Sequence, residues 1–274
     1  MTTDPTTGPA VLVVQHEDGA DAGLVGDRLT RGGLRLDVVR AWSGEGVSLP
    51  GDLRGYAGLL VLGGAVNCED DEAAPWLPRV RDLVREAVAD DVPLLGICLG
   101  GQIVADALGG SVVTRRQGPE LGAVPLRRLP AAAGDPVLGG VPEGALAAQW
   151  HWDEVERLPA GAVPLLSGDD CRYQAFRVGV AGWALQFHPE AGAETVAVWA
   201  QADGATVRAE GGDPDAAVRA VREAEPELRA VWGAVAEAWG GVVRDRAGGV
   251  REGARAVRER AGVVRERARG RSRR

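Results

Sequence analysis

The sequence predicts an α/β protein with a doubly wound, mostly parallel sheet and a C-terminal helical extension. Three observations support this fold class. Short apolar runs alternate with helical patterns between residues 10 and 110. Between residues 111 and 187, strand candidates follow one another with short turns and few helices. Beyond residue 190 the apolar positions return to a spacing of threes and fours, which is typical of helices.

The first 110 residues contain four expected strands, separated by helical segments. The apolar runs that predict the strands are 10–14, 34–39, 58–62 and 92–97. Helices are expected around Leu24 to Leu29, where the pair Gly32-Gly33 ends the pattern, and over 75–90 and 101–108. This order implies parallel strands with helices on both faces of the sheet.

The remaining elements extend this core. The expected strands, which should add antiparallel members to the sheet, are 112–115, 123–129, 162–167, 171–178 and 182–187. A helix is expected over 191–202, then a Gly/Asp/Pro break at 211–214 and a second helix. We therefore expect four parts, namely a disordered N-terminus (1–9), one domain (10–204), a helical segment (205–240) and an Arg-rich tail (241–274).

The tail has its own charge and period. It holds twelve Arg against four acids, a net charge of +8, so the rest of the chain carries −16 within the total of −8. Four heptads begin at Val243, Val250, Val257 and Val264, and Ala at the fifth position of each completes a narrow apolar seam. The small side chains and several Gly predict a marginal helix or a disordered tail. The alternative is docking on an anionic surface, such as a partner, the acidic body, lipid or nucleic acid.

Composition excludes several classes of protein. No apolar run reaches the length of a membrane span, and residues 1–9 do not resemble a secretory signal. Three scattered Cys form neither a disulfide framework nor a zinc site, so a cytoplasmic location is expected. The acidic body is a poor nucleic-acid binder, which leaves only the tail open to that function.

Cys98 lies in the strongest local motif. The apolar run 92–97 leads into Gly96-Ile97-Cys98-Leu99-Gly100, and a helix follows. This is the strand–turn–helix pattern of a nucleophile elbow, with Cys in place of Ser. A helix N-terminus favours the thiolate and would lower the thiol pKa, and the Leu99 N–H would point toward a developing oxyanion. The alternative is a buried core thiol.

His188 provides the partner that such a thiolate needs. It ends the strand 182–187, and Glu190 follows two residues later beyond a Pro. A base that shuttles the proton and a carboxylate that orients the base would complete a catalytic triad. His16 also ends a strand, but we interpret it as part of a solvated loop.

The segment from Gly96 to Gln102 and the segment Phe187-His188-Pro189-Glu190 together resemble class I, triad-type glutamine amidotransferases. The resemblance covers about residues 10–200 and is greatest to free-standing members similar to the amidotransferase domain of GMP synthase. It implies the flavodoxin-like amidotransferase fold, with Cys98 as nucleophile, His188 as base and Glu190 as its orienting carboxylate.

The resemblance also assigns residues around the triad. Gly64, after Leu62-Gly63, matches the oxyanion loop and would act with Leu99, although Ala65 replaces a frequent Pro. Gln102 matches a position that helps to hold the substrate glutamine. His151, between two Trp, would line an acceptor-side or gating loop, and Phe176 would frame the glutamine pocket. For His151 the alternative is a structural role, with packed Trp side chains and a hydrogen-bonded His, and for Phe176 it is an ordinary position in a strand.

Two other features are expected to be structural. The acidic run 69–72 should cap the helix that follows it, because helix N-termini favour carboxylates, and a position at the pocket rim is the alternative. Cys68 and Cys171 should be unreactive thiols, because neither has elbow glycines or a paired His.

The leading hypothesis is release of ammonia from the glutamine side chain through a glutamyl thioester, with no metal and no organic cofactor. Residues 205–274 contain no phosphate-binding loop, so a separate synthase subunit would accept the ammonia. The first alternative is hydrolysis of another γ-glutamyl amide or peptide by the same triad. The second is a non-catalytic scaffold that binds a partner through its basic tail.

Overall fold

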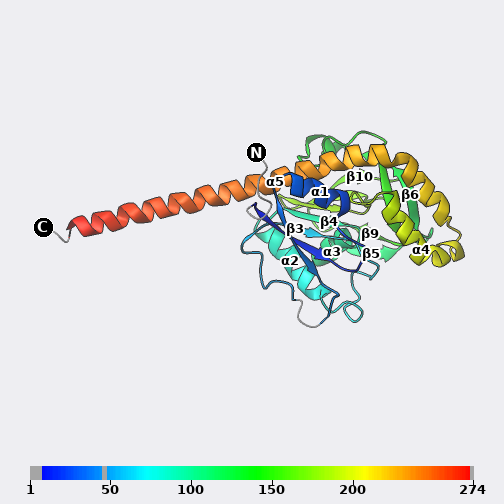
Figure 1. The fold of residues 1–274 in the computed structure, drawn as a ribbon, viewed down its shortest axis with the longest axis horizontal. Helices are drawn as coiled ribbons and strands as arrows, with labels where there is room; N and C mark the ends of the chain where they lie inside the picture. Colours follow the sequence, from blue (N-terminus) through cyan, green and yellow to red (C-terminus); the bar gives the residue numbers. More distant parts are fainter. Residues whose placement is uncertain (1–7, 45–47, 272–274) are drawn as a thin grey trace.

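The computed structural model describes residues 8–44 and 48–271, with side chains through Gly249. The expectation for residues 1–9 lies almost wholly outside the described residues. The centre of the fold is an eight-stranded sheet of order β2-β1-β3-β4-β12-β11-β10-β7 (Figure 1). Its first five strands are mutually parallel: β2 Arg35–Arg40, β1 Ala10–Gln15, β3 Tyr56–Val61, β4 Leu94–Ile97 and β12 Gly182–Leu185. The remaining three are antiparallel additions: β11 Ala175–Val178, β10 Val163–Ser167 and β7 Arg127–Arg128.

The sheet is covered on both faces, which confirms the doubly wound fold class. Val11 and Val13 of β1 pack in one apolar cluster with helix α1 (Gly23–Arg31) and with helix α5 (Pro214–Arg271). Leu12 and Val14 point the other way, into the cluster formed with α2 (Leu77–Ala89) and α3 (Leu99–Ala107). Because successive side chains of a strand face opposite sides, an apolar run at consecutive positions is what a strand covered on both faces requires.

The middle of the chain departs from the expectation. The segment predicted at 123–129 is divided between β7, which joins the edge of the central sheet as predicted, and β6 (Glu120–Pro125). Strand β5 (Ser111–Thr114), from the segment predicted at 112–115, and β6 lie outside that sheet. They pair instead in two antiparallel ribbons, with β9 (Asp153–Arg157) and β8 (Leu146–His151) respectively. The sequence did not predict β8 or β9. A short 3₁₀ turn, η1 (Pro130–Gly134), lies between β7 and β8.

Two helices complete the fold. Helix α4 (Ala193–Ala209) is longer than predicted, and α5 (Pro214–Arg271) is continuous, with Pro226 inside it and no break at residue 240. The N-terminal half of α5 packs on α4, β6, β8 and α1 and buries Trp232, Trp239 and Val243 in the core. Its C-terminal part extends away from the body (Figure 1). Within the described part of the chain, no helix has the length and apolar character needed to cross a membrane.

Candidate active site

Cys98 occupies a strained turn between β4 and α3. Its backbone φ is 49° and ψ is −108°, a conformation that a non-glycine residue rarely adopts. Its N–H donates to the Leu185 carbonyl oxygen at 2.8 Å, which ties the turn to β12. Strain of this kind persists only where the surroundings enforce it, and it is concentrated at functional sites. The turn places Cys98 at the carboxyl end of the sheet, where ligands bind in open α/β folds.

Glycines on both sides of Cys98 allow this turn. A Cβ atom on Gly96 would lie 2.5 Å from the Gly100 carbonyl oxygen. A Cβ atom on Gly100 would lie 2.1 Å from the carbonyl oxygen of Val61 in β3. Both contacts are with backbone, which cannot move aside, so the packing of α3 on β3 and β4 explains why the motif has glycine at these positions.

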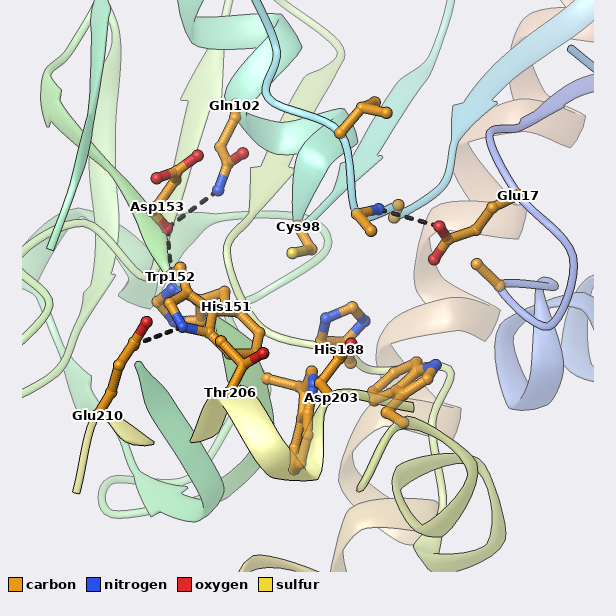
Figure 2. Close-up of a pocket in the computed structure, with 17 residues that line it drawn as sticks. Glu17, Cys98, Gln102, His151, Trp152, Asp153, His188, Asp203, Thr206 and Glu210 are labelled. Carbon is orange, nitrogen blue, oxygen red and sulfur yellow. Dashed lines mark hydrogen bonds between the residues drawn. The ribbon is translucent and has the colours of Figure 1, made fainter. Parts of the chain in front are cut away.

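His188 and Glu190 form a buried pair beside Cys98. His188 follows β12, and its Nδ1 lies 2.7 Å from Glu190 Oε1. Both side chains are almost completely buried. Figure 2 shows Cys98 and His188 in the same cavity, and the His188 Nε2 atom is buried without a hydrogen-bond partner among the described residues. The structure thus brings the three predicted triad residues together.

The His188 pKa reflects two opposing effects. Burial alone would lower it, but the negative charges of Glu190 and Cys98 outweigh burial and raise the pKa well above its ordinary value. The protonated imidazole is therefore the form that this site favours. A protonated imidazole next to a thiol can stabilise the thiolate, which is the nucleophilic form of Cys.

The loop after β3 lies opposite this pair. A Cβ atom on Gly63 would lie 3.1 Å from His188 Cε1 and 3.7 Å from the Cys98 Cβ, so a larger residue here would crowd the His188 ring. The N–H of the next residue, Gly64, donates to no acceptor among the described residues. Leu99 is the first residue of α3, so its N–H has no acceptor within the helix.

His16 was wrongly predicted to lie in a solvated loop. It is buried behind the Gly64 loop, where a Cβ atom on Gly64 would come within 2.8 Å of the His16 Cβ. Trp76 Nε1 donates to His16 Nδ1 at 3.0 Å. His16 is buried because Trp76, just before α2, packs against it. This burial lowers the pKa of His16 to about 4.

Gln102 and His151 form a second wall of the cavity. The Asp153 carbonyl oxygen accepts hydrogen bonds from Gln102 Nε2 at 3.0 Å and from His151 Nδ1 at 2.9 Å (Figure 2). His151 Nε2 lies 2.8 Å from Glu120 Oε2. Both ring nitrogens therefore face oxygen atoms, which fixes the orientation of the ring and of the turn between β8 and β9.

Phe176 is the predicted substrate-binding residue that does not line the cavity, unlike Gln102 and His151. It lies on β11 with 2% of its surface exposed, in the apolar cluster beneath α2 and α3. Strand alternation accounts for this position, because the neighbouring Ala175 faces the other cluster. For Phe176, the packing alternative describes the observed environment.

The acidic run 69–72 does not cap helix α2, contrary to the prediction. The helix begins only at Leu77, with no acidic residue in its first turn. The chain first makes a separate turn, in which Asp70 Oδ1 accepts the Ala73 N–H at 3.0 Å, while Asp71 pairs with Arg81 of α2. The carboxylates therefore stabilise this earlier turn and fix it to the helix.

Neither of the other two cysteines has the environment of Cys98. Burial raises the pKa of the Cys68 thiol to about 12 and raises that of Cys171 still further. Cys171 lies near Glu120 and His151, and within the described residues the three potential ligand atoms of this buried trio are within 4.8 Å of one another. A metal would need a deprotonated thiol and free ligand atoms on the other two residues. The Cys171 thiol has a raised pKa, and Glu120 and His151 are hydrogen-bonded to each other, so the trio is poorly suited to bind a metal.

The cavity has a volume of about 360 Å³, and the side chains that line it include five polar or aromatic ones that the sequence did not predict. Glu17 comes from the loop after β1, and the others lie on or directly after α4: Trp199, Asp203, Thr206 and Glu210. The α4 residues are spaced by four, three and four, which places them on one face of a helix. That spacing is visible in the sequence, but the sequence does not show which helix covers the cavity.

Fold and geometry together define an α/β protein with a cysteine and a histidine–carboxylate pair in one cavity at the carboxyl ends of the strands. The family model for class-I glutamine amidotransferases matches residues 25–197. This match spans more than half of the chain, and the protein belongs to that family of enzymes.

Several relatives are similar to this chain. A glutamine-hydrolysing GMP synthase subunit of Thermoplasma volcanium is 33% identical over 159 residues, which cover 56% of this chain and 74% of that protein. The GMP synthase of Thermotoga petrophila is 36% identical over 131 residues, but the match spans 48% of this chain and only 24% of that protein. γ-Glutamyl peptidase 3 of Arabidopsis thaliana is 29% identical over 145 residues, or 51% of this chain and 56% of that protein.

The fold has a solved counterpart. The crystal structure of a glutamine amidotransferase from Thermotoga maritima superposes with a TM-score of 0.74 at 26% identity. The superposition covers 85% of this chain and 98% of that one. The predicted family and fold class are thereby confirmed.

Proposed function

We propose that this protein hydrolyses the side-chain amide of glutamine through a Cys98–His188–Glu190 triad and a glutamyl thioester. One observation carries the proposal. The buried His188 has its Nδ1 fixed by Glu190 at 2.7 Å and its Nε2 unpaired among the described residues, next to a cysteine held in a strained elbow. This is the geometry that nucleophilic catalysis with an oriented base requires.

The reaction would proceed in two stages. The Cys98 thiolate attacks the amide carbon, and the N–H groups of Gly64 and Leu99 stabilise the oxyanion. Protonated His188 gives its proton to the leaving nitrogen, the C–N bond breaks, and ammonia departs from a glutamyl thioester on Cys98. His188 then takes a proton from water, whose oxygen attacks the thioester and releases glutamate. Glu190 stabilises the imidazolium in both stages.

We further propose that Gln102 and His151 position the glutamyl part of the substrate. Both side chains line the cavity on the side of Cys98 away from Glu17 (Figure 2). Their shared acceptor, the Asp153 carbonyl oxygen, keeps them in fixed relative positions. Phe176 would contribute only through packing, because it is buried in the core.

A separate synthase subunit is the proposed acceptor of the ammonia. The support is the relative from Thermoplasma volcanium, which is named as one subunit of a GMP synthase and which this chain matches over most of that protein's length. In the same way, we propose that residues 10–204 form the amidotransferase domain, since the family model matches 25–197 within it. Residues 205–240 would then form a helical segment packed on the domain, and 241–274 an Arg-rich tail whose first residues continue that packing through Val243.

Hydrolysis of another γ-glutamyl amide or peptide is the second candidate function. The relative named γ-glutamyl peptidase 3 favours it. The cavity volume falls within the range of small-molecule sites and fits either candidate. The same triad serves both functions, so only the substrate distinguishes them.

The test compares wild type with Cys98→Ala for glutamate release from glutamine and from a panel of γ-glutamyl compounds. We expect the variant to lose at least about 10³-fold in kcat/KM, because the nucleophile is removed. Equal rates in the two proteins would eliminate the enzyme hypothesis and favour a scaffold. Glutamine hydrolysis that needs a co-purifying synthase would exclude the second candidate.

A further inference from the structure

The cavity around Cys98 contains carboxylates that no arginine neutralises, and His188 is the protonated group that the protein itself places near them. Glu17, Asp203 and Glu210 all line the cavity. Among the described residues no Arg lines the cavity or forms an ion pair with any of these three, and the chain contains no Lys. Glu17 and Asp203 are half-buried, whereas Glu210 is exposed at the rim. A carboxylate that is partly withdrawn from water and forms no ion pair favours a positively charged ligand.

Each of these carboxylates uses one oxygen within the protein. Glu17 Oε2 accepts the Ala65 N–H at 3.2 Å, Asp203 Oδ2 accepts Trp150 Nε1 at 3.0 Å, and Glu210 Oε2 accepts Trp152 Nε1 at 2.7 Å. Their other oxygens accept no hydrogen bond from the described part of the chain. The protein thus fixes the direction of each carboxylate and leaves an acceptor atom at the cavity.

Aromatic rings continue the same surface. The Trp199 ring lies 4.6 Å from the His188 ring and 6.4 Å from the Trp150 ring, measured between centroids. Indole faces attract cations, and they do so most strongly where water is partly excluded. Carboxylates together with indole rings form an environment suited to an alkylammonium group.

The position of His188 shows which half of a substrate this surface would contact. In the proposed mechanism the His188 ring protonates the leaving nitrogen, so the leaving group must lie beside that ring. Figure 2 shows Asp203 next to His188, with Glu17 across from it and Gln102 and Asp153 on the far side of Cys98. Burial and the nearby Asp203 raise the pKa of Glu17, partly offset by its bond to Ala65 and by His188, which places these groups in one electrostatic environment.

We infer that the leaving-group side of the cavity selects a cationic amine, so that γ-glutamyl amides of diamines or polyamines are the preferred substrates. The inference rests on the proposed function and specifies the substrate class of the same site. The distal ammonium group would lie between Asp203, Glu17 and the Trp199 ring. The γ-glutamyl carbon would pass from the amine nitrogen to Cys98 Sγ, the free amine would leave with the His188 proton, and water would release glutamate.

The test uses three amides of similar size that differ in the charge at the distal end. They are γ-glutamyl-1,4-diaminobutane, γ-glutamyl-pentylamide and γ-glutamyl-4-aminobutyrate, which are cationic, neutral and anionic in turn, with glutamine measured beside them. We expect kcat/KM for the cationic amide to exceed that for the neutral one by about tenfold, and the anionic amide to be the poorest. The preference should weaken as salt is added.

Variants identify the groups responsible. Asp203→Asn and Glu17→Gln keep an acceptor for Trp150 and for Ala65, and each should lower the cationic-to-neutral ratio of kcat/KM by several-fold. Glu194→Gln removes an exposed carboxylate from the same helix outside the cavity and should leave that ratio unchanged. A ratio near one in wild type, or a preference for the anionic amide, would overturn the inference while glutamine hydrolysis still supports the proposed function. Absence of hydrolysis of all four compounds would overturn both.

Discussion

His188 and Glu190 are both buried, so little water screens the charge that each places on the other. In that environment the carboxylate decides the protonation state of the ring, because burial by itself favours neutral imidazole. The raised pKa of His188 means that the imidazolium persists to a higher pH than in an exposed histidine. The imidazolium in turn stabilises a thiolate. Glu190 therefore affects the stabilisation of the Cys98 thiolate through His188 and need not contact the sulfur.

Glu190→Gln tests this dependence. Gln keeps an acceptor for Nδ1 but removes the charge, so the pKa of His188 should fall and less imidazolium should be present to stabilise the thiolate. At about pH 6, alkylation of Cys98 by iodoacetamide should slow by about tenfold or more relative to wild type. Cys68 and Cys171 add little background because both are buried with raised pKa values. Superimposable profiles of alkylation rate against pH for wild type and Glu190→Gln would show that Glu190 does not control the reactivity of Cys98. Cys98→Ala is the control that measures the background rate.

His16 gives a second prediction, for stability rather than activity. Its pKa is about 4 in the folded protein and 6.5 for the ordinary side chain, so between these values the unfolded chain binds a proton that the folded chain does not. Stability that is present above pH 6.5 is therefore lost as the pH falls through this window, on the order of 3 kcal/mol in total. His16→Gln keeps an acceptor for Trp76 and removes the titration.

Urea unfolding at pH 7 and about pH 4.5 measures this effect. Between the two pH values wild type should lose about 2–3 kcal/mol more than His16→Gln, because all other titrating groups are shared. An equal loss in both proteins would mean that His16 is hydrated and titrates normally when folded.

Helix α4 shows how one element can determine a site without carrying its nucleophile. Its face with Trp199, Asp203, Thr206 and, just beyond the helix, Glu210 closes the cavity opposite the ends of the strands. Helix α5 packs against α4 and supports it from behind. The chemical step thus depends on β4 and β12, and the leaving-group surface depends on a helix that could change without affecting the triad.

Trp232 of α5 links that helix to the active site. Its ring lies 4.4 Å from the ring of Phe187, the residue before His188, and its Nε1 donates to the Leu146 carbonyl oxygen at 2.9 Å. Trp232→Ala should lower the free energy of unfolding by about 3–5 kcal/mol, because it leaves a large cavity and an unpaired carbonyl. It should also lower kcat/KM, since Phe187 would lose its support.

Urea denaturation with an unchanged m-value measures the loss, and Trp232→Phe should lose less. Glu223→Ala, an exposed position on the same helix, is the matched control and should stay close to wild type. A loss below about 1 kcal/mol for Trp232→Ala would show that α5 contributes little to the core.

What the sequence could predict differs between elements for physical reasons. The parallel strands leave a strong local signal, because strands covered on both faces are apolar throughout, and the elbow and the His–Pro–Glu segment are local motifs. Strands β8 and β9 were missed because their pairing partners lie far away, as with His151 opposite Glu120. The α4 residues of the cavity and the burial of His16 were missed because both depend on which distant segment covers them.

At the scale of the whole molecule, helix α5 joins the acidic body to the basic C-terminus. The sequence placed the start of the tail at residue 241, but the packing of α5 on the body continues past that residue. Val243 is fully buried, Arg244 donates to the Gly32 carbonyl oxygen and Arg246 to that of Asp91. Packing on the body therefore continues beyond residue 240, into the first heptad. The remainder, 250–274, has ten Arg and three acids.

Two truncations separate packing from charge. A chain ending at Gly249 keeps Val243 and both arginine contacts, so its urea midpoint and its glutamate release should match those of the full chain. A chain ending at Gly240 loses these contacts and should be about 1–3 kcal/mol less stable. If the Arg-rich segment binds anionic surfaces, both truncated chains should lose the retention of the full chain on a sulfated resin, a retention that falls steeply with salt. If the chain ending at Gly249 binds the resin as strongly as the full chain, the binding belongs to the body. If the chain ending at Gly249 is less stable than the full chain, the helix beyond Gly249 packs on the protein.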